Sequence, residues 1–220
     1  SNKKEILLMP TWRNWLDEVE EEEFIQSNYF QAYNELLHSE VLHSVLKERS
    51  LLLNFYVHPK FMPYVTSFTK SNENINIIQF GEAKVNDLLM RSSLLITDYS
   101  SVSWEMHYQK KPVLFYQFDV EQYNIYQGSY MNLDKELFGE TVYDSKKLVE
   151  SIASLASLGF VEKSKYANKR NEYFKYIDTK NSERIYHEIV LKEKEINKKQ
   201  PIFYSIRQSD LMKVLWRKYK

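Results

Sequence analysis

The chain has 220 residues, with 30 Lys and Arg against 30 Asp and Glu, and it contains no cysteine. This length suffices for one large α/β domain or for one lobe of a larger protein. The balanced charge gives no global field that recruits nucleic acid, and the lack of cysteine excludes disulfides, thiolate nucleophiles and Cys-based zinc sites. Without a bilayer-length apolar run or a signal-like N-terminus, the sequence predicts a cytoplasmic protein, and its abrupt entry into a strand suggests an excised domain.

Short apolar runs alternate with helix-like segments through the first half of the chain. We expect strands at residues 6–9, 51–57, 75–80, 94–97 and 113–118, and helices from Ser27, at 39–46, at 85–91 and at 100–109. The acidic run at 17–23 is typical of a solvated face or loop. Apolar strands that alternate with helices indicate a parallel sheet covered on both faces. The predicted fold class is therefore α/β, with a doubly wound, Rossmann-like parallel sheet.

The pattern beyond Asp144 is helical, with expected helices at 145–155, 161–176 and 181–197. The last twenty residues carry five Lys or Arg against one acid, with Leu211, Leu215 and Trp216 interleaved. We therefore predict one lobe over residues 3–200 and a basic amphipathic tail over residues 201–220.

Three polar stretches follow expected strands: PTWR at residues 10–13, HPK at 58–60 and TDYSS at 97–101. In an open parallel sheet, ligands bind beyond the carboxyl ends of the strands, where helix N-termini converge. We expect the three stretches to share one pocket.

The TDYSS stretch carries groups suited to a nucleotide. Hydroxyls of Ser100 and Ser101, with nearby free amides, can donate hydrogen bonds to phosphate oxygens without a glycine-rich loop. Glu105, one turn later, can accept hydrogen bonds from ribose. The alternative is plain capping of a helix by Asp98 or Ser100, with Glu105 solvated, and spacing alone favours this alternative.

His58 and Arg13 are the other candidates. At a strand end, His58 can contact a phosphate, stabilise a leaving group as imidazolium or transfer a proton; alternatively it is a hydrogen-bonded residue of a turn enforced by Pro59. Arg13 can clamp a phosphate, or it is a surface cation packed over Trp12.

Other chemistries find weaker support. Asp119 and Glu121 suggest a carboxylate pair for a divalent metal, but the start of a helix is the favoured interpretation. We interpret the histidines at positions 38, 43, 107 and 187 as structural or surface residues. No GxGxxG, Walker loop, HExxH or GxSxG occurs, so four common enzyme classes lack their motifs.

The motifs together resemble the CDP-glycerol glycerophosphotransferase family, whose members build teichoic-acid and related polyol-phosphate polymers. The matching segments are PTWR, the HP at residues 58–59, SLLITDYSS and KPVLFYQFDVEQY, and the likeness runs over about residues 6–155 in the family's order and spacing. TDYSS followed at this distance by KPVLFY is a specific signal, whereas each piece alone is not.

The resemblance implies the C-terminal, donor-binding lobe of a GT-B architecture. It implies that an acceptor hydroxyl attacks the β-phosphate of CDP-glycerol or CDP-ribitol and expels CMP, without a metal or other cofactor. His58 would be the catalytic or phosphate-contacting histidine. The donor-binding residues would be Arg13, Thr11, Asp98, Ser100, Ser101 and Glu105.

Two departures from the family pattern matter. The family's second catalytic histidine lies in an HG motif of the N-terminal lobe, and no His-Gly occurs here. We therefore expect the N-terminal acceptor lobe to be absent and this fragment to bind donor with little or no turnover. Many relatives also have Asp where this chain has Glu105, which weakens its ribose role.

The basic tail fits action at the cytoplasmic membrane face, where lipid-linked or polymer acceptors reside. Its packing as a C-terminal helix against the missing lobe is the slightly favoured alternative. Two other functions stay open: a GT-B glycosyltransferase that uses a nucleotide sugar, and a noncatalytic module that binds a membrane or a partner protein. No nucleic acid is expected, and the sequence does not choose between glycerol and ribitol.

Overall fold

The computed structural model describes residues 3–199. Its contacts divide the chain into two units, Ser1–Phe174 and Lys175–Lys220. The predicted lobe boundary at residue 200 and the basic tail at 201–220 lie at or beyond the end of the described residues and stay predictions.

The first unit is built on one parallel sheet. Its order is β3-β2-β1-β4-β5-β6, and every neighbouring pair is parallel. The strands are β1 (Lys4–Leu8), β2 (Leu51–Tyr56), β3 (Ile75–Ile78), β4 (Ser92–Thr97), β5 (Val113–Tyr116) and β6 (Glu140–Val142). The predicted doubly wound fold is confirmed, and β6 is an additional strand that sequence analysis did not find.

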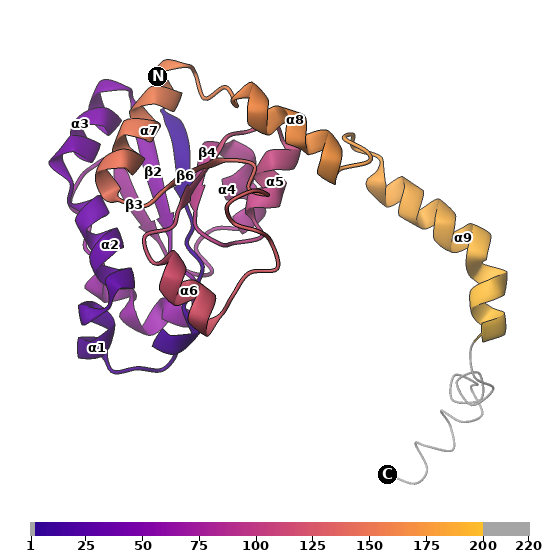
Figure 1. Cartoon of the computed structure of the whole chain (residues 1–220), viewed down its shortest axis with the longest axis horizontal. Helices are drawn as coiled ribbons and strands as arrows, with labels where there is room; N and C mark the ends of the chain where they lie inside the picture. Colours follow the sequence, from indigo (N-terminus) through magenta and orange to yellow (C-terminus); the bar gives the residue numbers. More distant parts are fainter. Residues whose placement is uncertain (1–2, 200–220) are drawn as a thin grey trace, which may run out of the picture. The chain divides into compact units, whose positions relative to one another are not determined.

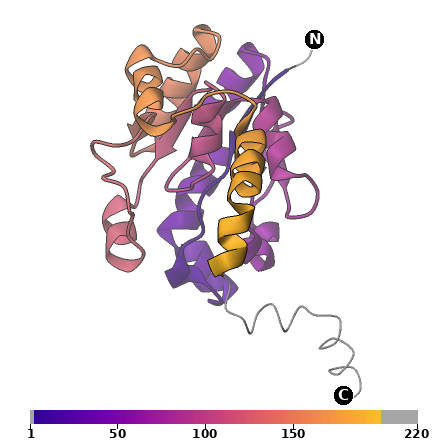
Figure 2. The same ribbon diagram turned by 90° about the vertical axis from the view of Figure 1, so that its right-hand side faces the viewer.

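Helices cover both faces of this sheet (Figure 1, and turned by 90° in Figure 2). The helices of the first unit are α1 (Glu21–Gln26), α2 (Asn28–Leu37), α3 (Glu40–Glu48), α4 (Val85–Arg91), α5 (Ser103–Tyr108), α6 (Val120–Tyr126), α7 (Ser145–Ser157) and α8 (Ser164–Tyr173), with 3₁₀ helices η1 (Asn14–Leu16) and η2 (Pro59–Ser67). Helices α2, α3 and α7 pack together on one face, while α4 and α5 contact the strands from the other, with α8 against α5.

The strands are buried on both faces because their side chains alternate between two apolar cores. Ile6 and Leu8 of β1 enter the core under α2, α3 and α7, whereas Leu7 enters the core under α4 and α5. This is the physical reason for the continuous apolar runs in the sequence.

Local capping signals mark the starts of α2 and α3. The hydroxyls of Ser27 and Ser39 accept from Phe30 N and Leu42 N, so they cap α2 and α3 as such residues typically do. The helix expected from residue 145 begins there and is capped by Asp144, whereas the helix expected at 100–109 begins only at Ser103. The acidic run at 17–23 is partly helical, because α1 begins inside it.

The carboxyl ends of β1 and β4 lie side by side at the point where the strand order reverses. Chain connections leave this point in opposite directions, which makes it the usual place for a ligand in an open parallel sheet. Both PTWR and TDYSS begin here, and HPK follows β2 on the other side of β1.

The second unit contains α9 (Asn181–Lys199), which matches the helix predicted at 181–197. Its exposed apolar side chains include Ile185, Ile189 and Leu191. No helix within residues 3–199 combines the length and apolar character needed to span a membrane.

Candidate functional site

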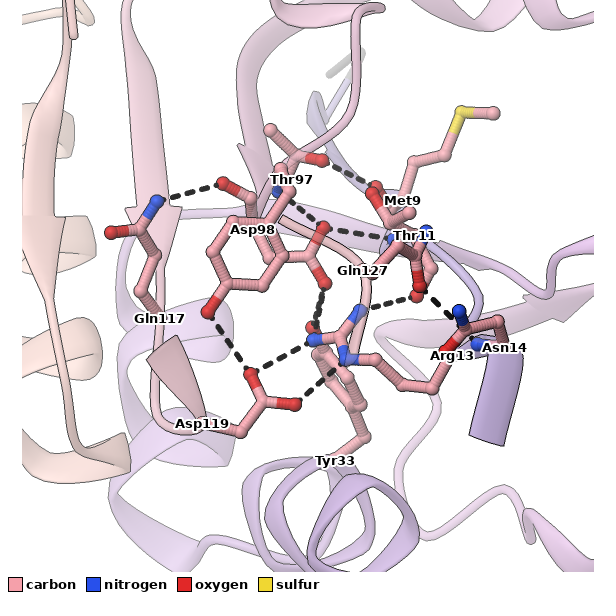
Figure 3. Close-up of polar contacts among 11 residues, drawn as sticks. Met9, Thr11, Arg13, Asn14, Tyr33, Thr97, Asp98, Gln117, Asp119 and Gln127 are labelled. Carbon is pink, nitrogen blue, oxygen red and sulfur yellow. Dashed lines mark hydrogen bonds and ion pairs between the residues drawn. The ribbon is translucent and has the colours of Figure 1, made fainter. Parts of the chain in front are cut away.

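Arg13 ties together the ends of three strands. Its Nε donates to Asp119 Oδ2 at 2.7 Å and its Nη2 donates to Asp119 Oδ1 at 3.0 Å, which makes a bidentate pair. Nη2 also lies 2.9 Å from Asp98 Oδ2, and Nη1 donates to Thr11 O at 2.6 Å. Figure 3 shows the guanidinium between the two carboxylates. Arg13 thus joins the loop after β1 to those after β4 and β5.

Water has no access to this guanidinium, since Arg13 is 0% exposed. Five aromatic rings have centroids within 6 Å of its Cζ, including Tyr99 at 5.1 Å and Tyr29 at 5.2 Å. Burial alone would lower the pKa of Arg13, but Asp98 and Asp119 outweigh burial and raise it well above its usual value. The group is therefore a permanent cation whose charge is more than offset by two carboxylates.

Asp98 anchors the turn that carries the serines. Besides Arg13, its carboxylate accepts from Thr11 N at 2.9 Å, Tyr99 N at 2.6 Å and Tyr33 Oη at 3.3 Å. The buried carboxylate thereby bridges the β1 and β4 loops. Asp98 does not cap α5, which was the alternative suggested by spacing.

Two further hydrogen bonds hold the backbone around the Asp98 carboxylate. Thr97 Oγ1 donates to Met9 O at 2.7 Å, and Gln117 Nε2 donates to Asp98 O at 3.1 Å (Figure 3). Thr11 Oγ1 is buried without a hydrogen-bond partner in the described chain. The PTWR and TDYSS stretches are therefore held in one arrangement, whereas a single pocket shared by PTWR, HPK and TDYSS stays a prediction.

Ser100 and Ser101 lie in a turn before α5, not at a helix N-cap. Ser100 is half-buried and its hydroxyl accepts weakly from Val102 N at 3.4 Å, whereas Ser101 is exposed. Glu105 lies on α5 and is exposed. A cavity of about 20 Å³ next to the two serines has room for one water, so a larger ligand must lie on the open side of this turn.

His58 stands at the end of β2 and is half-buried beside Trp12, whose ring centroid is 6.2 Å away. Lys60 N donates to His58 Nδ1 at 3.2 Å, so the proton of the neutral ring resides on Nε2. Burial lowers the pKa of His58, with Lys60 contributing, and Asp98 and Asp17 only partly oppose the shift. The ring is thus held as a neutral imidazole.

A buried cluster supports α5 from behind the serine turn. His107 Nδ1 lies 3.0 Å from Glu162 Oε1, and Arg170 pairs with the same carboxylate and donates from Nε to His107 O at 2.6 Å. The stacked ring of Phe138 covers His107 at 4.3 Å. This histidine is structural, as the sequence suggested.

The structure brings Thr11, Arg13 and Asp98 into direct contact and places His58 and the serine turn at the same sheet edge. Asp119 is the residue that sequence analysis missed, although it begins α6 as expected. Its pairing with Arg13 spans 106 positions, and no local pattern signals a contact between residues so far apart. Within residues 3–199 there is no group of three His, Asp or Glu placed to hold a metal ion.

The strand order and the polar edge define the class of fold, a Rossmann-like lobe of the GT-B type. The solved wall teichoic acid polymerase TagF resembles it with a TM-score of 0.64 at 21% identity, over 91% of this chain and 46% of that one. The chain belongs to the CDP-glycerol:poly(glycerophosphate) glycerophosphotransferase family, whose model matches residues 1–191. The resemblance drawn from its motifs is thereby confirmed.

Curated relatives are longer than this chain. The minor teichoic acid biosynthesis protein GgaB of Bacillus subtilis is 27% identical over 86% of the chain, which spans 21% of that protein. The teichoic acid poly(glycerol phosphate) polymerase of Bacillus spizizenii is 31% identical over 69% of the chain, which spans 36% of it.

Replacing Arg13 by Met should destabilise the fold by about 3–5 kcal/mol, because two buried carboxylates lose their cation. Arg91→Met is the matched control: Arg91 also pairs with a carboxylate, Glu5 at 2.7 Å, but its side chain is 47% exposed. We expect that change to cost about 1 kcal/mol or less. Urea unfolding midpoints measure both, and equal costs would contradict the role of Arg13 as a brace.

His58 should lower the free energy of unfolding at acidic pH. Its folded pKa lies below the unfolded value of about 6.5, so the unfolded chain binds the proton first and stability falls as pH drops below about 6.5. His58→Asn keeps an acceptor for Lys60 N but cannot titrate. Urea midpoints across this pH range should fall more steeply for the wild type; parallel curves would show that His58 is not the group responsible.

Proposed function

We propose that the chain is the donor-binding lobe of a polyol-phosphate transferase. It would bind CDP-glycerol or CDP-ribitol, and the complete enzyme would transfer the polyol phosphate to an acceptor hydroxyl and release CMP. The observation that carries this proposal is the placement of His58 and the Ser100–Ser101 turn at one sheet edge, within a family defined by this reaction. A TagF variant soaked with CDPG, itself of similar fold, is consistent with such a donor.

The spacing of the site suits a diphosphate with its polyol. β2 and β4 flank β1, so their ends lie about 10 Å apart, which is two strand spacings. Phosphate oxygens would accept from the hydroxyls of Ser100 and Ser101, with Ser101 the more accessible. Glu105, exposed on α5, would accept from ribose hydroxyls.

His58 would act as a neutral hydrogen-bond donor. Because Lys60 N occupies Nδ1, the protonated Nε2 is the ring atom left to face a phosphate oxygen. A neutral ring with its proton on Nε2 can stabilise charge that develops on the β-phosphate, but it cannot take a proton from the acceptor there. The base for the acceptor must then come from elsewhere in the complete enzyme.

The contribution to donor binding would be mainly structural for three residues, Arg13, Thr11 and Asp98. All four polar contacts of Arg13 are made within the protein, so a direct bond to pyrophosphate would require one of them to be exchanged. Held as they are, these residues fix the backbone of the TDYSS turn and leave its outer face to the ligand.

The remaining features of the proposal concern the whole enzyme. Transfer would be metal-independent, and the acceptor would be a polymer or a lipid-linked chain at the cytoplasmic membrane face. The basic tail at residues 201–220 would contribute any membrane contact.

Titration calorimetry of the chain with CDP-glycerol, CDP-ribitol, CMP and UDP-glucose, in EDTA throughout, tests the donor. A CDP-polyol should bind most tightly. The double variant Ser100→Ala, Ser101→Ala should weaken that binding by about tenfold or more, because two hydrogen bonds to a charged group are lost. Ser157→Ala at the end of α7 is the control.

A preference for UDP-glucose would favour a nucleotide-sugar glycosyltransferase instead. A membrane-binding module would be favoured if none of the four ligands binds and if liposome binding disappears when residues 201–220 are removed. Unchanged affinity in the double serine variant would leave the two hydroxyls as turn residues only.

His58→Ala should weaken CDP-glycerol binding but leave CMP binding unchanged, because CMP lacks the β-phosphate that Nε2 would contact. The ratio of the two dissociation constants is the readout, and circular dichroism checks the fold. An equal loss for both ligands would place His58 elsewhere than at the β-phosphate.

A further inference from the structure

A second cavity, of about 360 Å³, opens between η1, the start of α2 and α6. Its volume falls in the range of small-molecule sites. We propose that this cavity binds a neutral polyhydroxyl compound, either a polyol or a glycosyl unit. The inference goes beyond the donor and does not depend on the donor assignment, because the cavity is lined by other side chains than those of the serine turn.

Unused hydrogen-bonding groups line the cavity. The side chains of Glu23, Gln26, Asn28 and Gln122 face it and make no hydrogen bond or ion pair with the part of the chain that the structure describes. They come from α1, α2 and α6, segments almost one hundred positions apart. Such a convergence of free carboxylate and amide groups provides both donors and acceptors for a ligand.

Aromatic side chains form the walls. Trp15 is half-buried and its ring lies 5.2 Å from that of Tyr126. Tyr29 also lines the cavity, is 2% exposed, and has a buried hydroxyl without a partner in the described chain. An apolar wall beside polar groups suits a compound with C–H faces and hydroxyl edges.

The local charge selects against an anion. Asp119 lines the cavity, and Arg13 is already shared between Asp119 and Asp98, so these three groups sum to a negative charge. Glu23 adds another, and it continues the acidic first turn of α1. A phosphate or carboxylate would be repelled by this field.

A hydroxyl compound can use more of the amide groups than a simple cation can. Gln26, Asn28 and Gln122 each carry a carbonyl oxygen, which accepts, and an NH₂ group, which donates, whereas a cation can use only the oxygen. Hydroxyl groups donate and accept, so a neutral polyhydroxyl compound satisfies both the amides and the carboxylate.

Amide-detected NMR titration of the chain tests the proposal, with ribitol and N-acetylglucosamine as probes and glycerol 3-phosphate and putrescine as charged comparisons. We expect saturable shifts of the side-chain amides of Gln26, Asn28 and Gln122 for at least one neutral probe. Gln122→Leu should weaken that binding by about tenfold, since the ligand loses its hydrogen bonds to the half-buried Gln122 amide. Asn124→Leu, exposed on the same helix, should leave it unchanged.

The proposal would be overturned by no shift with either neutral probe, by tighter binding of glycerol 3-phosphate or putrescine, or by binding that survives both Gln122→Leu and Asn28→Leu in folded protein. CDP-glycerol titrated into the same variants reports on the donor separately. Loss of polyol binding in a variant whose affinity for CDP-glycerol equals that of the wild type supports the second site.

Discussion

The burial of one cation between two carboxylates is the constraint on which the ligand edge depends. Arg13 is sealed from water, so its charge must be met inside the protein, and Asp98 and Asp119 meet it from two different strand ends. Breaking either contact would leave a buried charge unpaired. The loops after β1, β4 and β5 can therefore move only as a group, and the edge keeps its shape without a ligand.

This brace explains how a chain with four glycines can hold the turn at which we propose that a phosphate binds. Glycine-rich loops approach a diphosphate closely because they lack side chains. Here hydrogen bonds to the Asp98 side chain hold the turn in place. The hydroxyls of Ser100 and Ser101 lie on this same turn. The same contacts pair Arg13 with carboxylates of the protein, so in the proposed site hydrogen bonding would carry more of the recognition than charge.

The sequence predicted the sheet because its strands are buried on both faces and appear as apolar runs. Sequence analysis did not predict β6, because this strand has three residues, of which only Val142 is fully buried. Strand ends at one edge also follow from a parallel fold, so the meeting of PTWR, HPK and TDYSS was predictable. The Arg13–Asp119 pair and the second cavity were not, because each depends on how α1, α2 and α6 pack over the edge.

The cluster of His107, Glu162 and Arg170 sets the extent of the folding unit. Arg170 lies beyond the last strand and the last helix of the sheet's covering layers, yet it is 5% exposed and holds the carboxylate that His107 contacts. A shortened chain that ended after α7 would leave His107 in the core with no counterpart. The compact unit therefore reaches Phe174, well past the region where the family motifs end. Replacing any one of these three residues alone would leave a buried polar group without its partner.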